Sequence, residues 1–192
     1  MIERPILFSA PMVRALLDGT KTQTRRVVTV PIGGGMVGLP IAADWLDADG
    51  ETRWSEKLCE KYGRPGDRLW VRETFAPRYF DNGKPGYRAD WTAVAADVVA
   101  EPKWKPSIFM RRTESRITLR VTAHRIERLQ AISEADAIAE GCTAATPAET
   151  LANGYPATVR YASLWDSLNG KKPGCSWADN PWVHVVTFER VE

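Results

Sequence analysis

The spacing of apolar positions predicts a short strand followed by a helix at the start of the chain. Residues 5–8 favour a strand, and Ser9 followed by Pro11 is typical of a helix start. The residues that then share one helical face are apolar: Met12, Ala15 and Leu16. Gly19 is placed to end this helix, because glycine readily adopts the left-handed conformation that follows many helix C-termini.

Several later segments have the pattern of strands. Residues 23–28 are rich in β-branched residues and arginine, which favours a strand. Residues 68–74 and 116–122 alternate between apolar and polar side chains, as half-buried strands do. Residues 182–188 are apolar on both faces, as expected of a central strand. The apolar phase changes at residues 123–124, which predicts a bulge or bend.

Two more helices and one long loop complete the pattern. Ser133 followed by Asp136 resembles a helix start, with Gly141 as the stop. Apolar residues at helical spacing predict a second helix that ends near Gly170. The pattern breaks down over residues 31–63, which contain three consecutive glycines, so we expect a loop insertion there.

These elements predict a single domain that spans residues 1–192. A chain of 192 residues can bury one core and is short for two independent domains. Five to seven strands and about three short helices, without regular βαβ alternation, indicate an α+β domain or a small barrel. No apolar run approaches the roughly 20 residues of a membrane span. The first residues also lack a signal-peptide pattern, so we expect a cytoplasmic protein without a membrane partner.

Composition and charge limit the kinds of functional site that the chain can form. Three cysteines without Cys-x-x-Cys spacing and two distant histidines argue against a disulfide framework and a zinc site. The formal net charge of +2 is too small to indicate nucleic-acid binding by itself. Its distribution is uneven: residues 103–128 hold eight basic and two acidic side chains, a local charge of +6. Trp104 lies in this stretch and is a candidate for stacking on a base, with Lys105 and Arg111 as further candidates for nucleic-acid contacts.

The segment 19–26, Gly-Thr-Lys-Thr-Gln-Thr-Arg-Arg, is the strongest candidate for a functional site. Its lysine, threonine and arginine side chains need anionic or polar partners, which a ligand or Glu73 can supply. Lys21 and Thr24 would point to opposite sides of a strand. The chain between them must therefore turn if they act together, and Gly19 supplies the backbone freedom for a turn.

Three motifs together resemble the ASCH domain of the PUA-like superfamily. They are the pattern Asp-Gly-x-Lys-Thr-x-Thr-x-Arg at residues 18–26, Gly-Asp at 66–67 before a strand, and Glu73 at the end of that strand. Residues 182–189 are similar to the closing strand of such domains. The resemblance spans nearly the whole chain and is closest to ASCH-like proteins commonly encoded by phages and prophages. It implies a PUA-like pseudo-β-barrel of five to seven strands with about three short peripheral helices, and a cleft for a nucleobase or RNA.

The resemblance also implies an activity. One branch of the family hydrolyses the N-acyl group of N4-acetylcytidine with a Lys, a Thr and a Glu, and Lys21, Thr24 and Glu73 match these positions. The expected partner is then a nucleoside or a single-stranded or modified RNA, and the hydrolysis of the amide needs no metal and no cofactor. Thr24 stands where many members carry a glutamate, which favours the amidohydrolase branch. Four neighbouring residues are expected to contact the substrate: Gly19, Thr22, Arg25 and Arg26.

For the hydrolase, two assignments of the general base remain open. Lys21 is the base, or Glu73 is the base while protonated Lys21 stabilises the oxyanion. A neutral Lys21 requires a pKa far below the ordinary value for lysine, and a neighbouring Glu73 carboxylate would oppose that shift.

Three alternatives to the hydrolase also remain open. The chain can be a non-catalytic reader of RNA or modified bases. It can be a single-strand ribonuclease, in which Lys21 and Arg25 stabilise the phosphorane and Glu73 moves a proton. Lys21 and Glu73 can instead form a structural salt bridge, because charged pairs commonly serve structure.

Overall fold

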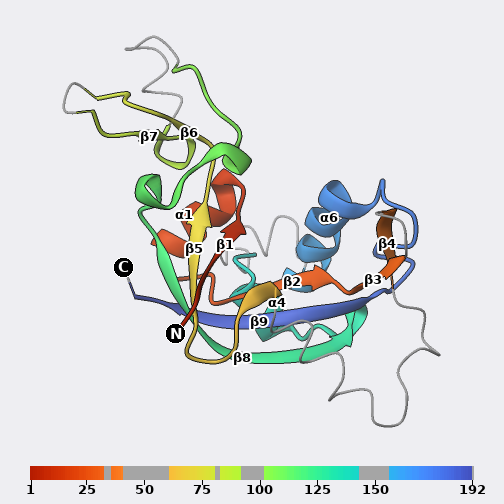
Figure 1. Ribbon diagram of the computed structural model, residues 1–192. Coiled ribbons are helices and arrows are strands. Elements are labelled where there is room, and N and C mark those ends of the chain that lie inside the picture. Colours follow the sequence, from red (N-terminus) through yellow and green to blue (C-terminus); the bar gives the residue numbers. More distant parts are fainter. Residues whose placement is uncertain (33–35, 41–60, 81–82, 92–101, 143–155, 192) are drawn as a thin grey trace.

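Figure 1 shows the computed structural model, which describes residues 1–32, 36–40, 61–80, 83–91, 102–142 and 156–191. The main sheet has five strands in the order β1-β5-β8-β9-β2. These strands are β1 (Glu3–Leu7), β5 (Arg68–Arg72), β8 (Thr118–Arg128), β9 (Trp182–Arg190) and β2 (Gln23–Val27). β1 and β5 are parallel, whereas the other neighbours are antiparallel. This mixed sheet with separate helices confirms the predicted α+β class.

Two small antiparallel pairs add to the main sheet. β3 (Thr29–Ile32) pairs with β4 (Met36–Pro40), and β6 (Phe75–Ala76) pairs with β7 (Gly86–Tyr87). The first pair includes residues that we expected to be loop, and residues 41–60 of that expected insertion lie outside the described ranges. The predicted five to seven strands cover the main sheet, and the two short pairs bring the described strands to nine.

The three predicted helices are α1 (Ala10–Leu17), α4 (Glu134–Ala139) and α6 (Ala157–Asn169). The predicted ends are confirmed at all three, since α6 ends at Asn169 with Gly170 as its C-cap. Gly19 follows α1 with a φ of +74°, in the left-handed region. The Ser133 hydroxyl caps α4 by accepting a hydrogen bond from the Asp136 N–H at 3.1 Å. Four short 3₁₀ turns are η2 (Arg88–Asp90), η3 (Ser107–Phe109), η4 (Arg112–Glu114) and η5 (Leu129–Ala131).

The interior strand β9 separates two hydrophobic cores. Val186 and Phe188 belong to the core that includes Phe8 and residues of α1, β5 and β8. Val183 and Val185 belong to the other core, which includes Tyr161 and Trp165 of α6. Because successive side chains of a strand point to opposite faces, this alternation explains why the segment is apolar on both faces. Its pairing with β8 on one side and β2 on the other confirms the predicted central strand.

The long strands β8 and β9 extend beneath both halves of the molecule, with α1 beside β1 and β5 and with α6 over β2 (Figure 1). Their pairing register shifts between Val121 and Ala123, which confirms the predicted irregularity. In the described ranges, no helix has the length and apolar character required to cross a membrane.

Candidate functional site

A pocket lies at the edge strand β2, where α1 and α6 approach it from two sides. Phe8 and Met12 line the α1 side, and residues of α6 line the other: Tyr161, Leu164, Trp165, Leu168 and Asn169. The polar part of the lining consists of Lys21, Thr24, Arg25, Arg26 and Glu140. The cavity volume is about 50 Å³. A buried water needs roughly 10–15 Å³ of such volume, so the pocket has room for about four waters, or for the edge of one ring.

Lys21 is buried at the base of this pocket. Its side chain sits in the turn that follows Gly19, and only 3% of the residue is exposed. Nζ donates three hydrogen bonds of 2.8 Å each, to the Gln23 carbonyl, the Glu140 carbonyl and Oε2 of Glu140. A lysine ammonium has three donors, and all of them are therefore used.

These contacts identify the charge state of Lys21. Burial lowers its pKa, and the Glu140 carboxylate opposes this effect. A neutral amine has only two N–H donors, so deprotonation would leave one of the three acceptors without its hydrogen bond. The geometry is that of an ammonium held by a carboxylate and two carbonyl groups.

Arg25 extends the same buried network. Its NH1 donates to Oε1 of Glu140 at 3.0 Å, so Glu140 bridges Lys21 and Arg25. Nε and NH2 of Arg25 donate to Oε1 of Glu127 at 3.0 and 2.6 Å, and NH2 lies 3.3 Å from a carboxylate oxygen of Asp136. The guanidinium of Arg25 is thus already hydrogen-bonded to carboxylates of the protein. The sequence had predicted that it contacts the substrate.

The network is electrically balanced. Arg125 closes it by donating to Glu127 at 2.8 Å and to Asp136 at 3.0 Å. Its cations are Lys21, Arg25 and Arg125, and its anions are Glu127, Asp136 and Glu140. Three positive charges thus match three negative charges, which joins β2, β8 and α4 without leaving a buried charge unpaired.

Thr24 has a different environment from its neighbours. It pairs with Val186 in the β2–β9 ladder, only 1% of it is exposed, and it lines the pocket. Among the described residues, no hydrogen-bond partner is found for its hydroxyl. The turn after Gly19 therefore brings Lys21 and Thr24 to one pocket, as the sequence required for joint action.

The other residues of segment 19–26 have separate roles. Arg26 lines the pocket and donates to the Leu7 carbonyl at 2.9 Å, with its guanidinium 5.5 Å from the centre of the Phe8 ring. Gly19 and Thr22 are exposed and are absent from the pocket lining. Gly19 shapes the turn, and Thr22 binds β9 and α4 through its backbone.

Glu73 does not pair with Lys21. Its carboxylate accepts hydrogen bonds from Arg116 at 2.9 and 3.2 Å, and Arg116 also binds Asp90 at 2.6 and 2.9 Å. Burial raises the pKa of Glu73 although Arg116 opposes the shift. The expected Lys21–Glu73 pair is therefore replaced by two pairs, Lys21–Glu140 and Arg116–Glu73, because β5 ends at Arg72 and the chain then turns toward η2.

Glu140 is the site residue that sequence reasoning missed. It lies 119 residues from Lys21 and directly after α4, so no local motif connects the two. The available signal was Gly141, which we predicted only as a helix stop. A side chain at Gly141 would place its Cβ 2.9 Å from that of Ala15 and 3.4 Å from that of Lys21. A glycine therefore permits the close approach of this chain segment to Lys21.

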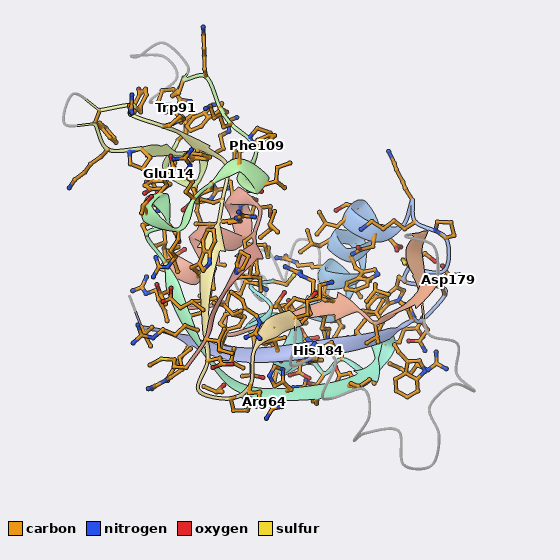
Figure 2. All side chains as sticks on the ribbon, in the orientation of Figure 1. Arg64, Trp91, Phe109, Glu114, Asp179 and His184 are labelled. Carbon is orange, nitrogen blue, oxygen red and sulfur yellow. The ribbon has the colours of Figure 1, made fainter. Side chains whose placement is uncertain are left out.

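The candidates from the basic stretch lie on another surface. Trp104, Lys105 and Arg111 are absent from the pocket lining and are grouped near β6 and β7. The Trp104 ring lies 5.8 Å from that of Trp91, and Lys105 and Arg111 are exposed. Figure 2 shows Trp91 in this part of the molecule, apart from α6.

The side chains that line the pocket set the chemistry that it can support. In the part of the chain that the structure describes, no group of three or more His, Cys, Asp or Glu side chains is placed to hold a metal ion. The chemical groups at the pocket are a threonine hydroxyl, a lysine ammonium, a bridging carboxylate and an arginine. They suit the recognition of a polar ligand edge, and the hydroxyl is also a potential nucleophile.

Comparisons with known proteins give one match. No model of a known protein family matches the chain, and no curated protein matches it. Among solved structures, the ASCH domain from Lactobacillus crispatus JV V101 is similar to this chain at 12% identity and a TM-score of 0.40, with 99% of this chain and 80% of that chain covered. The match is to the family that the sequence motifs resemble. A TM-score this low carries no argument about the site, so the proposals below rest on contacts within this chain.

Proposed function

We propose that the chain binds nucleosides or single-stranded RNA, with the edge of one nucleobase in the pocket at β2. The supporting observation is that Thr24 lines the pocket beside Lys21, Arg26 and aromatic side chains, and that its hydroxyl has no hydrogen-bond partner among the described residues. A base edge that offers a donor or acceptor to the Thr24 hydroxyl would gain a hydrogen bond at the pocket.

The rest of the lining suits a base. Phe8 and Trp165 supply aromatic surface, and Leu168 adds an apolar contact. A cavity of about 50 Å³ admits a ring edge but not a whole nucleotide, so the sugar and phosphate would remain outside. Arg26 is placed at the pocket to meet a phosphate with its guanidinium.

The binding proposal is tested by calorimetric titration with the four common nucleosides and with N4-acetylcytidine. Thr24→Val removes the hydroxyl at nearly constant shape, and the loss of one neutral hydrogen bond should weaken binding about 2- to 12-fold. Thr24→Ser keeps the hydroxyl and is the matched control, with affinity close to that of the wild type. The absence of binding to any nucleoside or RNA by the wild-type protein would reject the proposal.

The second candidate is a hydrolase of an amide on a modified nucleobase, such as N4-acetylcytidine. The observation that favours it is that Thr24 and Lys21 line the same pocket. The Thr24 hydroxyl would attack the acyl carbonyl and give its proton to a base, while a cation would stabilise the oxyanion. The amide C–N bond would then break, the exocyclic amine would leave with that proton, and water would hydrolyse the acyl-threonine to release the carboxylate. Since all three donors of Lys21 are used, the ammonium must exchange one hydrogen bond to take that role. Glu140, rather than the predicted Glu73, is the carboxylate beside Lys21.

The hydrolase is tested by mass spectrometry of N-acylated nucleosides after incubation with the protein. Thr24→Val should abolish turnover, whereas Thr24→Ser should retain part of it. Glu140→Gln keeps the shape of the side chain and should reduce turnover more than binding. If the wild-type protein binds these nucleosides but releases no acetate, the hydrolase is rejected and the reader function stands.

The predicted ribonuclease receives no support from the described contacts. Arg25, which would stabilise the phosphorane, is bound by carboxylates. Glu73, which would move the proton, is bound by Arg116 and lies outside the pocket lining.

A further inference from the structure

A second surface with the chemistry of a binding site lies on the part of the chain around β6 and β7. We call it the aromatic lobe, which comprises residues 75–80, 83–91 and 102–114. Three large apolar side chains on it are exposed: Phe80 by 53%, Ile108 by 58% and Phe109 by 64%. Figure 2 shows Phe109 on the side of the lobe that faces α6 in that view. Aromatic side chains this exposed contribute little to the core.

The rings behind this surface support one another. Tyr79 packs edge-to-face against Phe80 at 5.1 Å and against Trp91 at 6.2 Å between ring centres. Trp91 in turn packs against Trp104 at 5.8 Å, and the Arg88 guanidinium lies 5.3 Å from the centre of the Trp104 ring. Edge-to-face pairs fix the orientation of their rings. Of the exposed side chains, Phe80 is joined to this ordered cluster through Tyr79.

The aromatic lobe is strongly cationic. Its described ranges contain seven basic and two acidic residues, a balance of 7 − 2 = +5. The two acidic side chains have local partners: Asp90 binds Arg116, and Glu114 accepts from the backbone N–H of Arg111. The basic residues are Arg78, Lys84, Arg88, Lys103, Lys105, Arg111 and Arg112, of which Arg112 pairs with Glu3 outside the lobe. Charge complementarity therefore points to an anionic occupant.

Hydrogen bonds connect the aromatic lobe to the residues that form one wall of the β2 pocket. Arg72 donates to the carbonyl of Met110, the residue after Phe109, at 3.1 Å. The carbonyl of Arg72 accepts a hydrogen bond of 3.0 Å from the N–H of Phe8, which lines the pocket. From α1, Arg14 donates to the Ala89 carbonyl of the lobe at 3.1 Å. The exposed aromatic surface and the pocket thus share one supporting wall.

We propose that the aromatic lobe is a stacking surface for a single-stranded nucleic acid that continues from the base held in the pocket. Exposed aromatic rings among lysines and arginines are the combination that binds single strands, because bases stack on the rings while the cations meet the phosphates. This inference rests on the proposed nucleobase pocket, and it makes the ligand a strand rather than an isolated nucleoside. The cationic charge of the lobe and the shared wall both favour this occupant.

The experiment compares a short and a long ligand on the full chain. Binding of cytidine is measured by calorimetry, and binding of fluorescein-labelled RNA and DNA strands of about 12 nucleotides is measured by anisotropy, within the roughly 4–16 nucleotides of known single-strand sites. The lobe variants are Phe109→Ala and Lys105→Ala. Val159→Ala and Lys171→Ala are matched controls at exposed residues elsewhere, and thermal melting checks that all four variants are folded.

The lobe variants should change the binding of the strand and of cytidine to different extents. Phe109→Ala should weaken strand binding about 5- to 150-fold, which is the range of stacking on one aromatic side chain, and leave cytidine binding unchanged. Lys105→Ala should reduce the slope of log affinity against log salt by about 0.7, as expected for one lost phosphate contact. The control variants should match the wild type in both measurements.

Other outcomes overturn one proposal or the other. If Thr24→Val weakens strand binding while both lobe variants match their controls, the lobe inference is wrong and the pocket stands. If the lobe variants lose strand binding and Thr24→Val changes nothing, the lobe stands as a binding surface and the pocket does not. Binding to vesicles of anionic phospholipid, lost in Phe109→Ala, with no binding to either strand, would make the lobe a membrane surface and overturn the inference.

Discussion

The ammonium of Lys21 donates to Oε2 of Glu140 at 2.8 Å, across 119 residues of sequence. Both residues are buried, and their backbones also form an isolated antiparallel bridge. Through its other carboxylate oxygen Glu140 binds Arg25 at 3.0 Å. One carboxylate at the end of α4 thus fixes the turn before β2 and the first part of β2, which are the segments that place Thr24 in the pocket.

Removal of this carboxylate should strongly destabilise the fold. Glu140→Ala leaves the buried cations Lys21 and Arg25 without their shared partner, and breaking a buried ion pair costs about 3–5 kcal/mol. Urea unfolding followed by circular dichroism measures the loss. The matched control is Glu189→Ala, which removes the partner of Arg120 in an exposed pair and should cost at most about 1 kcal/mol. Equal unfolding midpoints for the two variants would contradict the structural importance of Glu140.

The close approach of Gly141 to Ala15 and Lys21 predicts that alanine destabilises the fold to different extents at Gly141 and at Gly19. Gly19 and Gly141 have φ values of +74° and +90°, so alanine is strained at both, by roughly 1–2 kcal/mol. A Cβ at Gly19 has no neighbour within 4 Å, whereas one at Gly141 lies 2.9 Å from the Cβ of Ala15. Gly141→Ala should therefore destabilise the protein more than Gly19→Ala in the same urea experiment. The reverse order would mean that the contact with Ala15 relaxes without cost.

The sequence correctly predicted the structural features that depend on short-range interactions along the chain. The Ser133 cap, the glycine after α1 and the alternation in β8 each depend on a few consecutive residues, and each is present. The pair β3–β4 was missed because its strands flank three consecutive glycines that indicated a loop. Strand β6 was missed because two residues are too few to show an alternating pattern.

The partners of the buried charges could not be predicted in the same way. The sequence motifs predicted a pair of Lys21 with Glu73, through the family resemblance and because both residues follow predicted elements. The structure pairs Lys21 with Glu140 and Glu73 with Arg116. Which carboxylate reaches a given cation depends on how α4 packs against the turn after α1. That packing is a long-range property for which a single sequence offers no periodic signal.

Glu73 should prove dispensable for ligand binding. Its carboxylate is occupied by Arg116 and lies outside the pocket lining. Glu73→Gln keeps its shape, so affinity for nucleosides and any amide hydrolysis should remain at the wild-type level in the calorimetric and mass-spectrometric assays. Loss of turnover in Glu73→Gln, with stability and nucleoside affinity unchanged, would restore the predicted catalytic role of Glu73.

A buried histidine pair links β8 to β9. Nδ1 of His124 lies 2.8 Å from Nε2 of His184, and the two rings are stacked with centres 4.8 Å apart. A hydrogen bond between two ring nitrogens needs one donor and one acceptor, so at least one ring is neutral. Burial, and then the neighbouring His124, lower the pKa of His184 to about 3 from an ordinary value of 6.5.

The lowered pKa predicts a loss of stability in acid. Between pH 6.5 and about pH 3, the unfolded chain binds a proton at His184 that the folded protein does not. The contribution of His184 is therefore fully present above pH 6.5 and is lost as the pH falls toward 3, with a slope of up to about 1.4 kcal/mol per pH unit. Urea unfolding of the wild type and of His184→Gln, measured between pH 6.5 and about pH 5, isolates this effect from the carboxylates, which titrate lower. The difference in unfolding free energy between the two proteins should shrink as the pH falls. A difference that stays constant over this range would show that His184 accepts a proton in the folded state as readily as in the unfolded chain.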